Sequence, residues 1–216
     1  MNRDTSNTAL PCAIPDDAID SEAALNALFG AAGEASLRKE VPHLHSTYRQ
    51  WIERSPFAAV ATSGPGGLDV SPRGDPAPLV RIVDDQTLLL PERRGNNRVD
   101  GLRNLLHNPQ IALLFFIPGV GETLRVNGRA VIRTKPELLA SFAMDGALPK
   151  CVVEIRVDTV FFQCARAMLR SRLWRHEVRP DGVPTAGAML AALSSDEVGG
   201  PAYDRDLPAR QRSTLY

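Results

Sequence analysis

Between residues 57 and 161 the chain consists of short apolar runs separated by turns of glycine, proline or aspartate. Gly64-Pro65-Gly66-Gly67 and Asp84-Asp85 each lie between two such runs, so each predicts a β-hairpin. Alternating strands and helices are absent, which disfavours a doubly wound parallel sheet. We therefore expect a mainly β fold with flanking helices, an antiparallel barrel of about six strands, closed or half open. The runs lie at residues 57–62, 68–71, 79–83, 87–90, 111–117, 123–134 and 151–161.

The run at 123–134 shows the alternation of a strand with one buried face. Arginine and asparagine occupy most of the other face. Gly128 interrupts the apolar face, and a glycine inside a strand indicates a bulge or the close approach of another backbone. The apolar face contains Leu124, Val126, Gly128, Ala130 and Ile132.

Helices are predicted on both sides of this β region. The one interior helix spans residues 97–107, where Val99, Leu102 and Leu105 recur at helical spacing before Asn108-Pro109 ends it. We expect a flexible segment at 1–18, a barrel domain with N-terminal helices at 19–175 and a helical tail at 176–216. The other predicted helices span residues 21–28, 42–54, 163–170 and 185–193, with a short one beginning at Pro136.

The charge distribution favours a small anionic ligand over a nucleic acid. The chain has 25 basic and 25 acidic residues, but segment 61–180 carries a net charge of +5 while 1–60 carries −3 and 181–216 carries −2. DNA or RNA binding would favour a broad basic face. The longest apolar run has only seven residues, whereas a membrane span needs about 20. No secretory signal is readable, so we expect a cytoplasmic protein without a membrane partner.

The usual catalytic and metal-binding patterns are missing from the sequence. The three cysteines, Cys12, Cys151 and Cys164, form no CxxC pair, and the four histidines are scattered. No nucleophile elbow or HExxH motif occurs. We expect no metal site, and no catalytic side chain can be named.

The segment Arg93-Arg94-Gly95-Asn96-Asn97-Arg98 lies between a predicted strand and the start of the interior helix. A helix N-terminus offers free N–H groups and a positive dipole end, Asn96 or Asn97 can cap it, and the arginines add charge. This combination predicts an anion pocket, most naturally for a phosphate. The alternative is a capped helix with exposed arginines.

Three further segments are candidates for ligand contact. The loop from Asp69 to Asp75 can present Arg73, Gly74 and Asp75 to the edge of a flat polar ligand, or can be closed by its own Arg–Asp pair. The polar face of 122–130, with Thr123 and Arg125, can line a pocket or be solvated. Arg172 and Trp174 can stack on a planar ligand or close a subunit interface.

Taken together, these segments resemble the pyridoxamine 5′-phosphate oxidase-like family, the FMN-binding split β-barrels, in an uncharacterised bacterial branch. The resemblance covers roughly residues 42–175, with a weaker similarity at Leu215-Tyr216. It rests on the order and spacing of the matching segments rather than on any one motif. The matching segments are Ser55-Pro56-Phe57 with Thr62, then 69–75, 87–98 with 102–104, 108–109, 115–119, 122–130 and 164–174.

The resemblance implies a homodimer with FMN at the dimer interface. In the family, the turn that enters the interior helix holds the FMN phosphate, and Asn96, Asn97 and Arg98 occupy that turn here. Arg81 falls near a basic family position, and Thr123 falls where the family often has a glutamine facing the flavin. Arg172 and Trp174 would approach the flavin from the partner subunit.

The pyridoxal phosphate side of the family pattern is poorly matched. The sequence therefore favours an FMN-dependent oxidoreductase acting on an unknown small substrate, with Arg73 or Arg125 as the cation near the flavin ring. A non-catalytic flavin carrier or sensor is the first alternative. A split barrel that binds haem or a deazaflavin is another, with His107 or His176 as the central axial candidates for haem. A structural dimer with an empty pocket is the last.

Overall fold

The computed structural model describes residues 15, 17–175 and 181–216, and it divides the chain into two compact units at residues 38 and 39. The described part of the first unit contains α1 (Glu22–Phe29) and α2 (Glu34–Arg38). The Ser21 hydroxyl accepts a hydrogen bond from the N–H of Ala24, which confirms the predicted N-cap, and Gly30 ends α1 with a φ of 70°. The predicted flexible segment 1–18 lies almost entirely outside the described residues.

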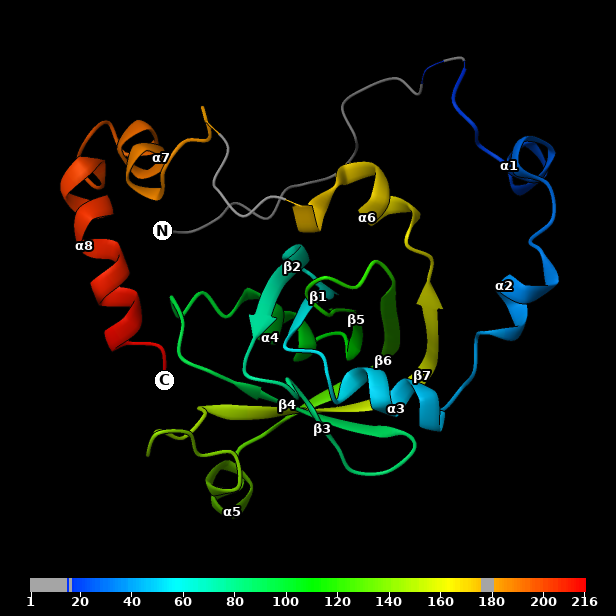
Figure 1. Ribbon diagram of the computed structural model, residues 1–216, viewed down its shortest axis with the longest axis horizontal. Helices are drawn as coiled ribbons and strands as arrows, with labels where there is room; N and C mark the ends of the chain where they lie inside the picture. The colour runs from blue at the N-terminus through cyan, green and yellow to red at the C-terminus, as the bar shows by residue number, and fades with distance from the viewer. Residues whose placement is uncertain (1–14, 16, 176–180) are drawn as a thin grey trace. The chain divides into compact units, whose positions relative to one another are not determined.

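The second unit is built on one antiparallel sheet of seven strands in the order β2-β1-β5-β6-β7-β4-β3 (Figure 1). The predicted mainly β fold is confirmed, with one strand more than the approximate six. Both predicted hairpins form, although only Arg81 and Ile82 of the run at 79–83 pair as a strand. The strands are β1 (Phe57–Gly64), β2 (Gly67–Gly74), β3 (Arg81–Ile82), β4 (Thr87–Glu92), β5 (Gln110–Phe116), β6 (Thr123–Arg133) and β7 (Cys151–Gln163).

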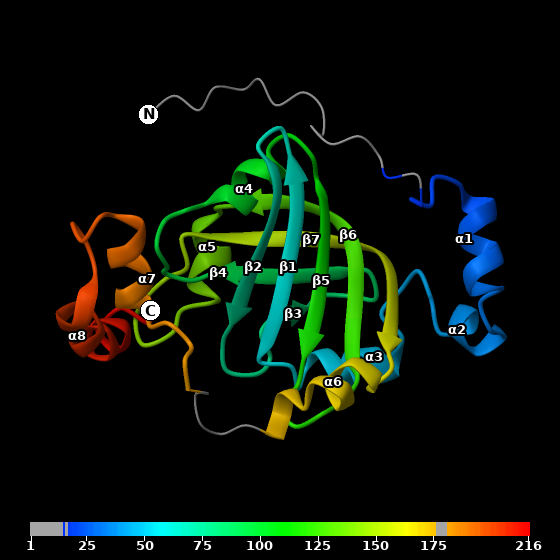
Figure 2. The ribbon, with the colours of Figure 1, turned by 90° about the horizontal axis from the view of Figure 1, so that it is seen from above.

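The sheet curls around a core made from the inward faces of its strands. In Figure 2, β4 and β7 run crosswise behind β1, β2 and β5. Phe115, Leu124 and Ile155 are fully buried there. Gly128 is where the pairing register of β6 and β7 shifts, and a Cβ on it would lie 2.3 Å from the carbonyl oxygen of Arg156. The predicted close backbone approach is therefore confirmed.

Several predicted helix boundaries are wrong. α3 (Ser46–Ile52) begins four residues after Pro42, because the His45 imidazole accepts the N–H of Thr47 and starts the helix there. α4 (Asp100–Leu105) is shorter than the predicted 97–107. The predicted helix at 185–193 is present, but α8 (Gly200–Ser213) was not predicted, since it contains Pro208 and begins at the glycine pair Gly199-Gly200. The remaining helices are α5 (Pro136–Ala140), α6 (Arg166–Ser171), the 3-10 turn η1 (Leu173–Arg175) and α7 (Ala186–Leu193).

The outward face of β1, β2 and β5 is apolar and carries no helix across it in Figure 2. Leu68 and Val70 of β2 are 86% and 69% exposed, and Phe57 of β1 packs edge-on against Phe116 of β5. Among the described residues no helix is both long and apolar enough to cross a membrane.

Candidate functional site

A cavity of about 570 Å³ opens between the C-terminal ends of β2 and β4 and the segment that leads from β4 to α4. This volume is in the range of small-molecule and cofactor sites. We call residues 94–99 the cationic loop. The cavity is lined by Asp69, Ser71, Pro72, Arg73, Gly74, Leu79, Pro91, Glu92, Arg93, Cys151, Lys150, Asp100, Leu102 and the whole of the cationic loop.

Two ion pairs of opposite polarity lie at this cavity, one between two lining residues and one between the lining residue Arg93 and Asp75, which does not line it. The Arg73 Nε donates to Glu92 Oε1 at 2.8 Å, and the Arg93 Nε donates to Asp75 Oδ2 at 2.7 Å. All four side chains are largely buried, the most exposed being Arg73 at 24%. Since β2 is an edge strand that pairs only with β1, these side chains join it to the β4 end of the sheet. The alternative reading of the 69–75 loop, closure by its own Arg–Asp pair, is not observed, because Arg73 pairs with Glu92 of β4 and Asp75 pairs with Arg93 just after β4.

The cationic loop is not the N-terminus of a helix. Asn97 has a φ of 61°, a left-handed conformation that cannot continue into a right-handed helix. The Asn96 Oδ1 accepts the N–H of Arg98 at 3.0 Å, a local bond that competes with helix formation. α4 starts only at Asp100, after Val99, which makes no side-chain cap. The prediction that Asn96 or Asn97 caps this helix is therefore wrong, and the charge of the loop has to come from side chains.

Arg94 and Arg98 belong to the cationic loop, and a third cation, Lys150, reaches it from a distant part of the chain. Lys150, next to the start of β7, donates from Nζ to Asn97 Oδ1 at 2.8 Å. Arg98 pairs with Asp100 at 2.9 Å and is 68% exposed. Arg94 is exposed and makes no hydrogen bond or ion pair within the described residues. The sequence analysis did not identify Lys150 and Glu92 as site residues, because it is the pairing of β4 with β7 that brings them together. The local signal that could have pointed to Lys150 is the rarity of lysine in this chain.

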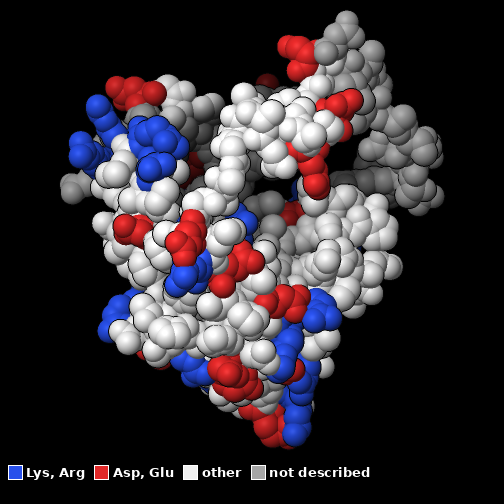
Figure 3. Space-filling model, turned by 90° about the vertical axis from the view of Figure 1, so that its right-hand side faces the viewer, with Lys and Arg blue, Asp and Glu red and all other residues white. Residues whose placement is uncertain are grey.

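The cavity is positive overall. Its lining includes Arg73, Arg93, Arg94, Arg98 and Lys150 against Asp69, Glu92 and Asp100, a formal excess of two positive charges. Glu92 neutralises Arg73, and Asp75, which is outside the lining, neutralises Arg93. The charges left are those of Arg94, Arg98 and Lys150 against Asp69 and Asp100, so the remaining excess is one positive charge, and it lies at the cationic loop. By contrast, Figure 3 shows a face on which basic and acidic side chains are interleaved, without the continuous basic surface that nucleic acids require.

α4 is held tightly against the β1–β2 hairpin, which fixes the far end of the cationic loop. The Asn104 Nδ2 donates to Thr62 Oγ1 at 3.3 Å and to the Gly67 carbonyl at 3.2 Å. A Cβ on Gly101 would lie 2.8 Å from Asp69 Oδ2, and one on Gly64 would lie 2.9 Å from the Asn104 Cα. The two glycines therefore permit this close packing.

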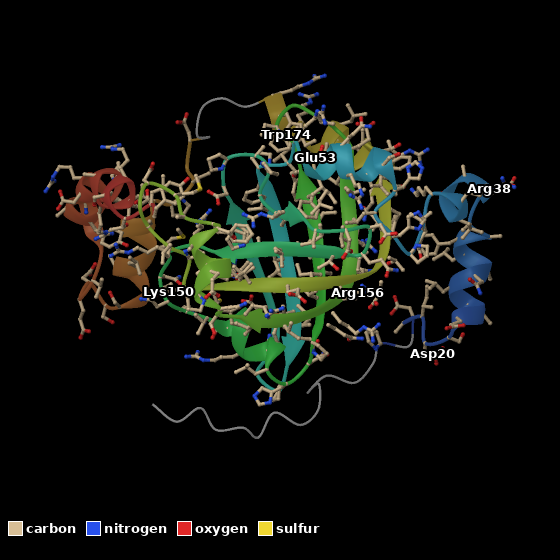
Figure 4. All side chains as sticks on the ribbon, turned by 90° about the horizontal axis from the view of Figure 1, so that it is seen from below. Asp20, Arg38, Glu53, Lys150, Arg156 and Trp174 are labelled. Carbon is tan, nitrogen blue, oxygen red and sulfur yellow. The ribbon has the colours of Figure 1, made fainter. Side chains whose placement is uncertain are left out.

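The other predicted site residues lie elsewhere in this chain. Thr123 is buried at the start of β6, and Arg125 lies 4.8 Å from the Phe161 ring centroid on the outward face of the sheet. Trp174 donates from Nε1 to the Val120 carbonyl at 2.8 Å, and Figure 4 shows it well away from Lys150. Arg172, in a left-handed conformation with a φ of 54°, precedes the 3-10 turn that carries Trp174.

A smaller side pocket of about 300 Å³ adjoins the cavity, with Arg93, Pro91 and Leu79 contributing to both. Asp75 and Arg81 line the side pocket rather than the cavity. Arg81 stacks on Phe142, with its Cζ 3.8 Å from the ring centroid, and donates to the Ser141 carbonyl at 2.6 Å.

Neither thiol nor imidazole chemistry is set up in the cavity. Burial, together with the Glu92 carboxylate, raises the pKa of Cys151 to about 11 against the opposing effect of Arg73, so this thiol stays protonated. No histidine lines the cavity among the described residues: His107 is exposed beyond α4, and His176 lies outside them. No cluster of possible metal ligands occurs in the described part of the chain.

The chain was compared with known proteins. A search of curated proteins finds no match. Solved structures with similar chains include HupZ of Group A Streptococcus (20% identity, TM-score 0.44, covering 56% of this chain and 94% of that one). Others are General Stress Protein 26 of Bacillus anthracis (17%, 0.39, 53% and 88%) and an FMN-binding protein of Syntrophomonas wolfei (9%, 0.40, 53% and 86%).

The decisive comparison is with protein families. The sequence of residues 44–164, more than half of the chain, matches the pyridoxamine 5′-phosphate oxidase family. The matched segment runs from just before α3 to just after β7, so it contains the whole antiparallel sheet and the cationic loop. The predicted family and split-barrel fold are confirmed, and the chain belongs to the pyridoxamine 5′-phosphate oxidase family.

Proposed function

We propose that this protein binds FMN in the cavity between β2 and β4, with the FMN phosphate at the cationic loop. The observation that carries the proposal is the excess of positive charge at one end of a cavity of about 570 Å³, contributed by Arg94, Arg98 and Lys150. Family membership supports the same ligand.

The residues present fit a phosphate monoester, which carries a charge of about −1.5 to −2 at neutral pH. Arg94 is not engaged by any described carboxylate, and Lys150 uses one of its three donors on Asn97. Arg98 would have to share its guanidinium between Asp100 and the phosphate, which its exposure permits. These three side chains would hold the phosphate, with the Asn96 and Asn97 amides as further donors.

The ring end of the ligand would lie toward the β2 wall. Arg73 and Gly74 line that wall, and Glu92 holds the Arg73 guanidinium in place. Bound FMN would supply the hydride or electron transfer, while this chain binds it, orients it and excludes water. The protein would then be an oxidoreductase acting on a small substrate. Because Glu92 neutralises its charge, Arg73 would offer the ring a hydrogen-bond donor rather than a net positive charge.

The protein would act as a homodimer. The apolar outward face of β1, β2 and β5 supports this assembly, because exposed apolar patches of this kind mark interfaces. Arg125 lies on the outward face of β6, where it pairs with Leu114 of β5. A second copy seated on this face would bring Arg172 and Trp174 toward the ligand from the partner subunit, as the family resemblance implies, and Thr123 and Arg125 would remain candidates for contact with the ring.

The decisive experiment is the visible spectrum of the purified protein, followed by titration with FMN. We expect a flavin spectrum with near one FMN per chain, and Arg98→Ala should weaken FMN binding by about 1.5–3 kcal/mol. Arg129→Ala is the matched control, since that exposed arginine pairs with Asp158 and, among the described residues, with no other carboxylate. Wild-type affinity in the Arg98 variant would show that the loop is not the anchor.

The same preparation separates the alternatives. Bleaching of the flavin by a nicotinamide donor supports an enzyme, whereas a bound flavin that no donor reduces supports a carrier or sensor. A deazaflavin would use the same phosphate contacts and differ in its spectrum. A haem spectrum would overturn the FMN proposal, and its persistence in a His107→Ala variant would exclude His107 as the axial ligand.

A further inference from the structure

After α8 the chain returns to the barrel, where Tyr216 contacts Asp75 and Asp75 contacts Arg93, which lines the cavity. The Tyr216 Oη donates to Asp75 Oδ1 at 3.2 Å, while the other Asp75 oxygen accepts from Arg93. The Arg93 Cζ also lies 5.7 Å from the Tyr216 ring centroid. Figures 1 and 2 both place the end of the chain beside α7 and α8, at the side of the barrel from which the β4–α4 segment emerges.

A buried ion pair needs its remaining donors and acceptors satisfied by neighbouring groups. The Asp75 side chain is only 5% exposed and that of Arg93 is 15% exposed. The Phe142 carbonyl accepts from the Arg93 Nη1 at 2.7 Å, and Tyr216 provides the hydrogen bond to the second Asp75 oxygen. Tyr216 therefore completes the polar shell of this pair and covers part of the guanidinium.

Arg93 immediately precedes the cationic loop, so its position determines where that loop starts. The other end of the loop is fixed by α4, which Asn104 holds against the β1–β2 hairpin. Within the described residues, the loop's own side-chain hydrogen bonds are those of Asn96 with Arg98, Arg98 with Asp100 and Lys150 with Asn97. None of them involves Arg94, so the position of Arg94 depends most directly on Arg93.

We propose that Tyr216 is a positioning residue for the anion site: through Asp75 and Arg93 it holds the cationic loop in the geometry that binds a phosphate. The inference rests on the proposed FMN function, and it assigns to the α7–α8 tail a role in ligand binding that the family match at residues 44–164 does not cover. Its effect should be confined to the phosphate end of the ligand.

The experiment compares the dissociation constants of FMN and of riboflavin, which lacks the phosphate, by quenching of flavin fluorescence. Their ratio measures what the phosphate contributes. We expect Tyr216→Ala to lower the preference for FMN by about threefold to tenfold, the equivalent of one to two hydrogen bonds, and to leave riboflavin binding unchanged. Tyr216→Phe, which keeps the ring and removes only the hydroxyl, should show a smaller loss in the same direction.

Tyr203→Phe is the matched control, because this α8 tyrosine packs on Arg210. Thermal unfolding of each variant shows whether the barrel is intact. If Tyr216→Ala unfolds the protein, the comparison rests on Tyr216→Phe and Asp75→Asn. An unchanged FMN-to-riboflavin ratio in folded variants, or an equal loss for both ligands, would overturn the inference. Failure of the wild-type protein to prefer FMN would instead overturn the proposed function.

Discussion

The guanidinium of Arg73 lies 2.8 Å from the carboxylate of Glu92, and this contact joins edge strand β2 to β4 at a place where the two strands share no backbone hydrogen bonds. β3 pairs only with Leu88 and Leu89, so the end of β4 that carries Glu92 has a free edge. Side chains therefore bridge a gap that the sheet leaves open, and both of them line the cavity.

Glu92→Gln should lower the free energy of unfolding by about 1–2 kcal/mol, because it leaves the largely buried Arg73 without its counter-charge. Urea denaturation measures the change. Asp158→Asn, at the exposed pair with Arg129, is the control and should cost less than about 0.5 kcal/mol. Equal effects of the two substitutions would show that the Arg73–Glu92 pair does not hold the two strands together.

Lys150→Ala should weaken FMN binding by about tenfold, because it removes a cation from the phosphate end of the cavity. Isothermal titration with FMN at two salt concentrations checks this, and the difference between variants should shrink at high salt. Lys135→Ala is the matched control, since Lys135 lies away from the cavity beside Glu137. A Lys150 variant with the affinity of the wild type would remove this residue from the site.

Cys151 and Cys164 should differ sharply in reactivity. Cys164 is exposed, whereas Cys151 is buried and has a pKa raised to about 11. Near pH 8, iodoacetamide should label Cys164 rapidly and Cys151 only after unfolding, as peptide mass spectrometry can show. Rapid labelling of Cys151 in the folded protein would contradict its burial.

The same thiol predicts how stability depends on alkaline pH. The folded protein holds the Cys151 proton more tightly than the unfolded chain, whose thiol has an ordinary pKa of 9.0. This contribution to stability is complete below that value and is lost as the pH rises toward about 11. Cys151→Ala should flatten that part of the profile, measured as the denaturation midpoint against pH. A profile unchanged by the substitution would assign the alkaline loss to other groups.

Gly128→Ala should destabilise the barrel by about 2 kcal/mol or more, because the added Cβ would lie 2.3 Å from the Arg156 carbonyl oxygen and force β6 and β7 apart. Gly66→Ala in the β1–β2 turn is the control, since nothing lies within 4 Å of the position of its Cβ. Thermal unfolding of the two variants provides the comparison. Tolerance of alanine at position 128 would mean that the bulge can open without cost.

Local patterns in the sequence were sufficient to predict the strands, both hairpins and the bulge at Gly128, because the alternation of apolar residues and the residue types of turns depend on neighbouring positions. They also located the cationic loop. They did not place the start of α4, since the bond between Asn96 and Arg98 and the left-handed Asn97 compete with a helix that the apolar spacing favours.

The tertiary structure alone decided which charges meet. Arg73 and Asp75 were predicted to contact a ligand, yet in the structure Arg73 forms an ion pair with Glu92 and Asp75 forms one with Arg93. Lys150 reaches the loop because β7 pairs with β4, and Tyr216 reaches Asp75 across 141 positions of the sequence. Charge pairing across such separations depends on the sheet order and on the burial of the pairs, neither of which is encoded by spacing along the chain.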